Sequence, residues 1–174
     1  MYLPTDDSFL LAESAKQYAG DAALEIGVGS GIVLKVLYNN FKIVVGTDIS
    51  LVSLRYCKRN LPSNILLACS DAASAFHHRF DLIVTNPPYL PDTEDKNKDV
   101  AVSGGPTGIE TILHFIKSGI TLLNPSGKML TIISTVSNIS KMDELLVQMG
   151  LKRRIISQKN LFFETLSTVE ISAK

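Results

Sequence analysis

The feature that most constrains the fold of this chain is a regular alternation of apolar, strand-like runs with segments of helical periodicity. The runs are short and almost continuously apolar, as in strands that are buried on both faces of a sheet. They are Ala22–Ile26, Lys42–Asp48, Asn64–Cys69, Phe80–Thr85 and Lys128–Ser134. The helical segments between and after them are Ile32–Asn39, Leu51–Asn60, Gly108–Leu123 and Ile139–Met149. This alternation predicts an α/β protein whose parallel sheet is covered by helices on both faces.

The carboxyl-terminal end departs from the alternation. Two β-rich runs, Leu151–Gln158 and Phe163–Ile171, are separated by only a few residues. Such a connection cannot hold a crossover helix, so we expect these two strands to be antiparallel. The sequence therefore predicts a mixed sheet. A length of 174 residues, 45% of them hydrophobic, fits one domain that spans residues 1–174.

Charge and cysteine content exclude several classes of protein. Seventeen basic residues balance seventeen acidic ones, and the lack of a basic excess disfavours binding to nucleic acid. Neither a signal peptide nor an apolar run of the roughly 18 residues that a membrane span needs is visible, so we expect a cytoplasmic protein. Cys57 and Cys69 have no metal-ligand spacing, which predicts reduced thiols in or near the core and no metal site.

A glycine-rich loop and two acids follow the first three predicted strands. Glu25–Gly31 (EIGVGSG) opens the first helix after the first strand, and its glycines permit a tight turn and close approach of a ligand. Its spacing differs from the GxGxxG of dinucleotide-binding loops. Asp48 ends the second strand, 21 residues after Gly27, where an acid can bind both ribose hydroxyls. Asp71 follows the third strand, with the alternative role of N-cap to a short helix Ala72–Phe76.

The tetrapeptide Asn86-Pro87-Pro88-Tyr89 follows the fourth strand directly. Ligands bind at the carboxyl ends of the central strands in open α/β sheets. The side-chain oxygen of Asn86 and the carbonyl of Pro87 can each accept one N–H from a planar NH₂ group. The prolines hold the loop in place, and Tyr89 can pack against a flat acceptor. The residues therefore favour a reaction at a planar nitrogen, with positioning as the main catalytic effect.

Taken together, these motifs resemble those of class I methyltransferases that use S-adenosylmethionine (SAM). ExGxGxG resembles their motif I, and NPPY after the fourth strand is typical of amino-methyltransferases. Two further segments, Pro4–Leu11 (PTDDSFLL) and Gly104–Glu110 (GGPTGIE), resemble the PxEDTxLL and GGxxGxE segments of the HemK family of glutamine methyltransferases. Asp6 and Ser8 replace the usual Glu and Thr. Because the catalytic fold begins almost at Met1, the chain resembles the short archaeal and eukaryotic branch of that family.

The resemblance implies a fold, a cofactor and a substrate. The fold is the Rossmann-like class I methyltransferase fold, a seven-stranded mixed sheet in the order 3-2-1-4-5-7-6. The substrate is the glutamine of the Gly-Gly-Gln motif in a class I release factor, and the products include S-adenosylhomocysteine. The implied catalytic residues are Asn86, Pro87, Pro88 and Tyr89. The implied SAM-binding residues are Ser8, Glu25, Gly27, Gly29, Gly31, Asp48, Asp71 and Asn86.

Within this set, the resemblance places Asp71 beside the adenine amine, and Glu25 can balance the cationic end of SAM. Ser8 has the alternative role of N-cap to a helix Phe9–Tyr18. The polar loop Pro91–Val100 is read as a solvated loop or as a lid over the substrate. Lys152-Arg153-Arg154 is read as a solvated strand edge or as a weak contact for acidic or RNA-bound surfaces.

Two other functions are compatible with parts of this motif pattern. A nucleic-acid amino-methyltransferase shares the NPPY motif, but the neutral charge disfavours it. A SAM-binding module without turnover is the other class, and the intact Asn86–Tyr89 argues against it.

In the expected strand order, Asn64–Cys69 is an apolar edge strand without a protecting charge. The short branch pairs with a small zinc-binding activator protein, and we expect this activator to cover that strand or the adjacent helix Leu51–Asn60. Self-dimerisation or a C-terminal segment would be the other ways to cover it.

Overall fold

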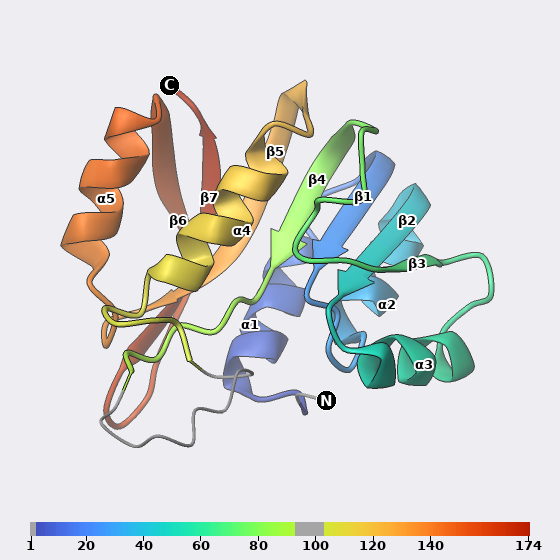
Figure 1. The fold of residues 1–174 in the computed structure, drawn as a ribbon, viewed down its shortest axis with the longest axis horizontal. Helices are drawn as coiled ribbons and strands as arrows, with labels where there is room; N and C mark the ends of the chain where they lie inside the picture. The colour runs from blue at the N-terminus through green and yellow to red at the C-terminus, as the bar shows by residue number, and fades with distance from the viewer. Residues whose placement is uncertain (1–2, 93–102) are drawn as a thin grey trace.

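The computed structural model describes residues 3–92 and 103–174 and is built around a seven-stranded sheet (Figure 1). The order is β3-β2-β1-β4-β5-β7-β6, as the resemblance implied. Strands β1 to β5 pair in parallel, whereas β7 is antiparallel to both β5 and β6. The strands are β1 (Gly20–Ile26), β2 (Phe41–Asp48), β3 (Leu66–Cys69), β4 (Phe80–Thr85), β5 (Leu123–Ser134), β6 (Leu151–Asn160) and β7 (Thr165–Ala173).

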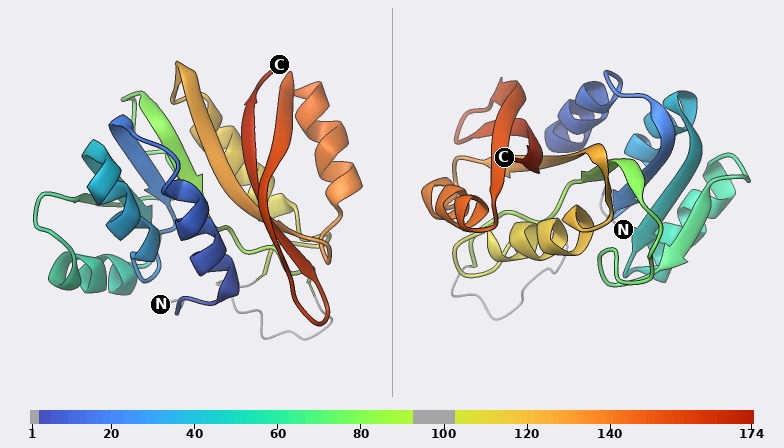
Figure 2. Two further views of the ribbon diagram at one scale, coloured as in Figure 1. Left: turned by 180° about the vertical axis from the view of Figure 1, so that it is seen from behind. Right: turned by 90° about the horizontal axis from the view of Figure 1, so that it is seen from above.

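Helices cover both faces of this sheet (Figure 2). The helices in the described part of the chain are α1 (Asp6–Ala15), α2 (Ile32–Asn40), α3 (Leu51–Asn60), α4 (Glu110–Ile120) and α5 (Ile139–Gln148). α1 and α2 lie on one face and α4 and α5 on the other, while α3 lies beside β2 and β3. The three-layer arrangement predicted from the alternation of strands and helices is therefore confirmed.

The core is divided into two apolar clusters by the sheet, because successive strand residues point to opposite faces. On β1, Leu24 and Ile26 belong to the cluster under α4 and α5, whereas Ala23, the residue before Leu24, belongs to the cluster under α1, α2 and α3. On β5, Met129 and Leu130 divide in the same way. All five of these side chains have no solvent exposure, which explains why the strands read as continuous apolar runs.

Several element boundaries differ from the expected ones. α1 begins at Asp6 and not at Phe9, because the acids of its first turn are favoured by the helix dipole although they break the apolar pattern. Ser8 therefore lies inside the helix, and Thr5 occupies the N-cap position that we expected Ser8 to fill. β5 begins at Leu123, within the segment expected to be helical. Phe163, expected in the last strand, lies in the turn before β7.

Candidate active site

A cavity of about 430 Å³ lies at the carboxyl ends of the central strands. Residues after β1, β2, β3 and β4 form its walls, together with side chains from the start of α1 and from α4. The candidate residues that line it are Ser8, Glu25, Gly27, Gly29, Asp48, Asp71, Asn86, Pro87, Pro88 and Tyr89. Gly31 is a candidate that does not line it. The fold therefore brings together candidate residues, such as Ser8 and Tyr89, that lie more than eighty positions apart in the sequence.

The glycine-rich loop is held against the end of β2 and leaves its backbone open to the cavity. The amides of Gly27 and Val28 both donate to the carbonyl of Thr47, at 2.8 and 3.0 Å. Gly27 has a φ of 78°, and a Cβ there would meet only the ring of Phe115, at 3.6 Å. The loop is thus a preformed cradle in which bound ligand can approach main-chain atoms closely.

Gly31 has a packing role. It is the N-cap of α2 with a φ of 75°, a conformation that L-residues with side chains rarely adopt. A Cβ at this position would lie 2.8 Å from Leu61 Cδ1 and 2.9 Å from Cys57 Sγ. Glycine is therefore required here by the close contact of the loop with α3 and the residue that follows it.

Glu25 presents an unpaired, buried carboxylate oxygen at the base of the cavity. The residue is 3% exposed, and its Oε2 atom has no hydrogen-bond partner. Burial raises the pKa of Glu25 well above its ordinary value, and repulsion by Asp48 adds to this effect. A buried carboxylate oxygen without a partner is costly, so the position is suited to a ligand group that carries positive charge.

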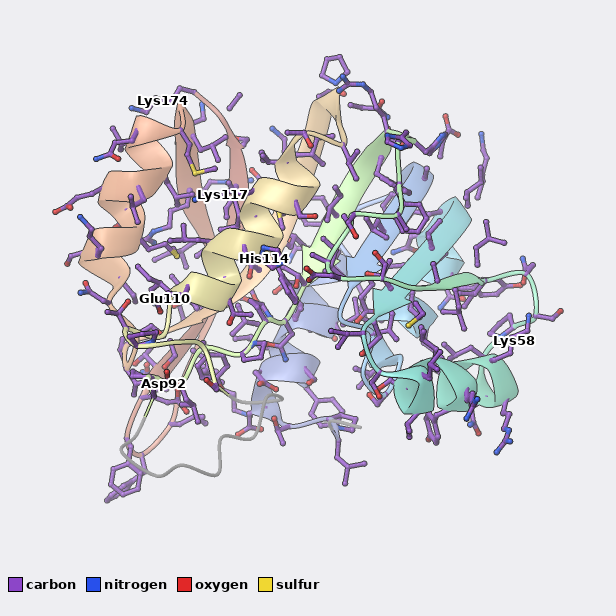
Figure 3. All side chains as sticks on the ribbon, viewed as in Figure 1. Lys58, Asp92, Glu110, His114, Lys117 and Lys174 are labelled. Atoms are coloured by element: carbon purple, nitrogen blue, oxygen red, sulfur yellow. The ribbon has the colours of Figure 1, made fainter. Side chains whose placement is uncertain are left out.

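Two further acids face the cavity from the ends of β2 and β3. The Oδ2 atom of Asp48 accepts from the amide of Gly29 at 3.0 Å, and its Oδ1 atom accepts from the amide of Ser50 at 2.7 Å. Asp71 caps no helix, because residues 72–75 form a turn, and its carboxylate instead lies 2.9 Å from Nε2 of His114. His114 projects from α4 near the end of β4 (Figure 3) and was not a candidate from the sequence. Ala72 beside this pair has a φ of 46°.

Asn86 is oriented by a short chain of hydrogen bonds that begins at α1. The buried carboxylate of Asp7 accepts a hydrogen bond from Ser8 Oγ at 3.1 Å, and Ser8 Oγ accepts from Asn86 Nδ2 at 3.4 Å. This order of donors leaves Asn86 Oδ1 buried and without a partner. Asp7 was also not a candidate from the sequence. Its role at this site depends on the packing of α1 against the end of β4.

The GGPTGIE segment packs tightly against the NPPY loop. The amide of Gly104 donates to the carbonyl of Leu90 at 2.8 Å, and Ser137 Oγ donates to the carbonyl of Tyr89 at 2.7 Å. A Cβ at Gly108, whose φ is 77°, would lie 2.4 Å from the carbonyl oxygen of Tyr89. Gly104 and Gly108 are therefore needed for close backbone contact with the acceptor loop.

Glu110 shapes the same segment from the start of α4 (Figure 3). Its carboxylate accepts from the amide of Thr107 at 3.1 Å, from Thr107 Oγ1 at 2.7 Å and from the amide of Ile109 at 3.2 Å. Partial burial opposes ionisation, but these hydrogen bonds outweigh it and lower the pKa of Glu110. The acid thus stabilises the turn that holds Gly108 against the NPPY loop.

Other candidate features lie away from this cavity. Arg153 forms a bidentate ion pair with Asp143, and Arg154 lies 3.3 Å from Glu170, so these bases belong to the solvated edge of β6. The proposed lid, Pro91–Val100, lies outside the described residues from position 93 onward. Cys57 is buried as expected, whereas Cys69 is exposed and our expectation for it was wrong. Residues 3–92 and 103–174 include neither a cluster of three metal ligands nor a helix able to span a membrane.

The strand order, the cavity at the carboxyl ends of the strands and the acceptor loop after β4 define a SAM-dependent methyltransferase of class I. The profile of the methyltransferase small domain family matches residues 6–162, and the chain belongs to this family. A protein of Methanocaldococcus jannaschii that carries the name protein N5-glutamine methyltransferase is 30% identical over 97% of this chain and 90% of its own length.

Two other comparisons concern a bacterial relative and a solved structure. The release factor glutamine methyltransferase of Geobacter sulfurreducens is 32% identical over 72% of this chain, and the match spans 50% of that longer protein. The structure of the E. cuniculi Mtq2–Trm112 complex, responsible for methylation of the termination factor eRF1, matches with a TM-score of 0.80. That match is 21% identical and covers 99% of this chain and 98% of the other, so it shows the fold.

Proposed function

We propose that this chain transfers a methyl group from SAM to the side-chain amide of a glutamine in the Gly-Gly-Gln motif of a class I release factor. The observation that carries this proposal is the buried, unpaired Oδ1 atom of Asn86 at the cavity wall. This oxygen can accept a hydrogen bond from an N–H of the substrate, and it lies in the loop that follows the central strand β4. The names of the relatives in Methanocaldococcus and Geobacter support the choice of glutamine over other planar nitrogens.

The cavity residues fit SAM chemically. Glu25 offers a buried carboxylate to the cationic end of the cofactor, and the backbone of Gly27 and Gly29 leaves room for close approach. The carboxylate of Asp48 is held in place by the amides of Gly29 and Ser50. Its remaining lone pairs can accept hydrogen bonds from the two hydroxyls of the ribose. Asp71 lies at the rim, where it suits the adenine amine. When bound, SAM supplies the electrophilic methyl group of the reaction.

The protein's own contribution is to position the acceptor amide. Asn86 Oδ1 accepts one N–H of the glutamine NH₂ group, and the carbonyl of Pro87 accepts the other. With both hydrogens fixed, the nitrogen lone pair points to one side of the amide plane, toward the cofactor side of the cavity. Pro87 and Pro88 restrict the loop, and Tyr89 lies against the flat amide. The nitrogen becomes acidic once it is methylated, so its proton passes to solvent without a dedicated base.

Intact mass spectrometry tests this function. A purified class I release factor incubated with the chain and SAM should gain the mass of one methyl group, on the glutamine of Gly-Gly-Gln. A release factor with that glutamine changed to alanine is the control and should gain nothing. Methyl transfer to free rRNA or DNA but not to the release factor would instead establish the alternative nucleic-acid activity. A release-factor substrate would also place the enzyme in the cytoplasm.

We also propose a small zinc-binding activator as a partner at the β3 edge. β3 is an edge strand as expected, and Leu66 within it is 57% exposed. Ile49, Leu51 and Val52 add exposed apolar surface around the start of α3. The presence of a second protein, Trm112, with Mtq2 in the E. cuniculi complex supports this proposal. An activator that adds a strand to β3 would satisfy the free edge and cover these side chains.

A further inference from the structure

A second surface lies at the carboxyl edge of the sheet, next to the acceptor loop, and the proposed reaction does not use it. The β6–β7 hairpin extends beyond the central strands on the same side of the molecule as the start of α1 (Figure 2). Its turn carries Phe162 and Phe163, which are 92% and 88% exposed. Two phenylalanines this exposed add nothing to the core, and an exposed apolar group of this size is typical of an interaction site.

The hairpin turn is fixed in place. The amide of Leu161 donates to the carbonyl of Glu164 at 2.8 Å, which closes the turn around the two phenylalanines. Lys159 of β6 lies 2.9 Å from Asp6 of α1, and Glu164 accepts a hydrogen bond from Ser134 at the end of β5. The rings of Phe162 and Phe163 pack edge to face with centroids 4.6 Å apart. A partner that binds here meets a preformed surface, so little ordering is needed on binding.

A cavity of about 340 Å³ lies between this hairpin and the NPPY loop. Its apolar lining residues include Phe9, Leu161 and Leu166, and its acidic lining residues are Asp6, Asp7 and Glu164. Asp7 and Tyr89 line both this cavity and the larger one that we assign to the cofactor and acceptor. The two cavities are therefore adjacent to each other.

We propose that the hairpin turn and this cavity form a docking site for the segment of the protein substrate that adjoins the methylated glutamine. The inference rests on the proposed function. An extended chain that leaves the acceptor loop past Tyr89 enters this cavity directly. Within the described part of the chain, Asp6, Asp7 and Glu164 line this cavity and Lys159 is ion-paired with Asp6, an excess of acidic residues that favours a segment with a basic side chain. The apolar wall and the exposed pair Phe162–Phe163 favour a bulky apolar side chain beside it.

The double variant Phe162→Ala/Phe163→Ala in the full chain tests this site, with Tyr38→Ala as the control. Tyr38 is 38% exposed and lies in the last turn of α2, which packs against β1 and β2 and not against the hairpin strands β6 and β7. For a class I release factor, the double variant should show a KM about tenfold higher or more, as expected for loss of aromatic anchors. Its kcat and its affinity for SAM in titration calorimetry should match those of the wild-type chain. The control should leave KM unchanged.

A charge variant tests the basic specificity. Glu164→Gln keeps an oxygen that can accept from Ser134 but removes the charge. We expect about a threefold higher KM and a weaker dependence of KM on salt, as for loss of a charge at the rim of an interface. A salt dependence equal to that of the wild-type chain would overturn the preference for a basic segment.

The outcomes separate this inference from the proposed function. A wild-type chain that neither binds nor methylates the release factor would overturn both. A wild-type chain that methylates it, with an unchanged KM in the double variant, would overturn the docking site alone. A double variant that changes only the mass measured by light scattering would show that the phenylalanines join two copies of this chain, and would also overturn the docking site.

Discussion

The most unusual residue of the candidate site is Glu25, a buried acid without a partner for one of its oxygens. Because its pKa is raised in the folded state, the folded chain holds this proton at pH values where the unfolded chain has lost it. The contribution of Glu25 to stability is therefore full below its unfolded pKa of about 4.3 and is lost as the pH rises through the folded value. Glu25 thus lowers the stability of the ligand-free chain at neutral pH, and it offers a carboxylate whose charge a cationic ligand can neutralise.

We predict that Glu25→Gln makes the ligand-free chain more stable and weakens its affinity for SAM. The amide has nearly the same shape but no charge to desolvate, so the gain in the free energy of unfolding should be larger at pH 7.5 than at pH 5. Urea denaturation at both pH values and calorimetric titration with SAM check the two parts. Glu144→Gln, at an exposed helix position, is the control and should change neither. An unchanged SAM affinity in Glu25→Gln would contradict the role of this acid.

At Asn86 the prediction concerns rate rather than binding. Asn86→Ala removes the one acceptor that the chain from Asp7 through Ser8 orients. We expect turnover on a release factor to fall by roughly a hundredfold or more, because a positioned polar group is lost. SAM binding, measured by calorimetry, should persist. A variant with near-normal turnover would show that the acceptor amide is positioned by other groups.

At the scale of elements, the contact between the GGPTGIE segment and the NPPY loop leads to a matched pair of substitutions. Gly108 and Gly150 have φ values of 77° and 70°, so alanine imposes a similar backbone strain at both. A Cβ at Gly108 meets the carbonyl of Tyr89 at 2.4 Å, whereas nothing lies within 4 Å of one at Gly150. Gly108→Ala should therefore displace the acceptor loop and Gly150→Ala should not.

The measured result should be a lower kcat on the release factor for Gly108→Ala, by about tenfold or more, with SAM affinity retained. Both variants should lose about 1–2 kcal/mol in the free energy of unfolding, because alanine is strained in a left-handed backbone conformation. Gly108→Ala should lose more than this, because its Cβ also collides with the carbonyl oxygen of Tyr89. Equal kcat values for the two variants would show that the segment does not position the acceptor loop.

Elements with strong local signals were predicted well from the sequence. The bounds of α3 and β4 match the expected Leu51–Asn60 and Phe80–Thr85, since a serine caps the first and two prolines follow the second. The residues predicted for the ends of the strands line one cavity, with Gly31 as the exception. Local pattern is sufficient there because parallel strands bring their carboxyl ends to one edge whatever the details of packing.

The missed residues depend on contacts between distant parts of the chain. Asp7 meets Tyr89 across 82 residues and His114 meets Asp71 across 43, and no periodicity records such pairs. Asp7 is also charged, so its burial breaks the rule by which core positions are found in a sequence. Phe162 and Phe163 break it in the other direction, because both are apolar but exposed, and Phe163 was expected to begin the last strand.

For the whole molecule, the two edges of the sheet differ in how they are protected. β6 carries charges along its length, whereas β3 presents Leu66 without a charged neighbour in the strand. We predict that Leu66→Lys blocks binding of the activator and reduces its effect on turnover. Val147→Lys on α5 is the control, since the two positions are 57% and 56% exposed. Light scattering with and without the activator provides the measurement.

Complex formation by Leu66→Lys with the affinity of the wild-type chain would contradict pairing at this edge. A wild-type chain that forms dimers alone, and a Leu66→Lys variant that does not, would instead show that a second copy covers β3. In either case the Val147→Lys control distinguishes a local effect at β3 from a general effect of an added lysine on association.

The position of the two cysteines gives the chain a built-in pair of chemical reporters. Cys57 lies behind the glycine loop, and its Sγ atom is 3.7 Å from the carbonyl oxygen of Gly29. Burial is the main cause that raises the pKa of Cys57 to about 12, and the nearby acids Glu25 and Asp48 raise it further. Cys69 ends the exposed edge strand. Alkylation of Cys57 therefore requires the loop to open and slows when a ligand holds it closed, whereas alkylation of Cys69 slows when a partner covers the edge. Since the sequence contains only these two thiols, one labelling time course resolved by peptide mass follows cofactor and partner separately in the unmodified protein.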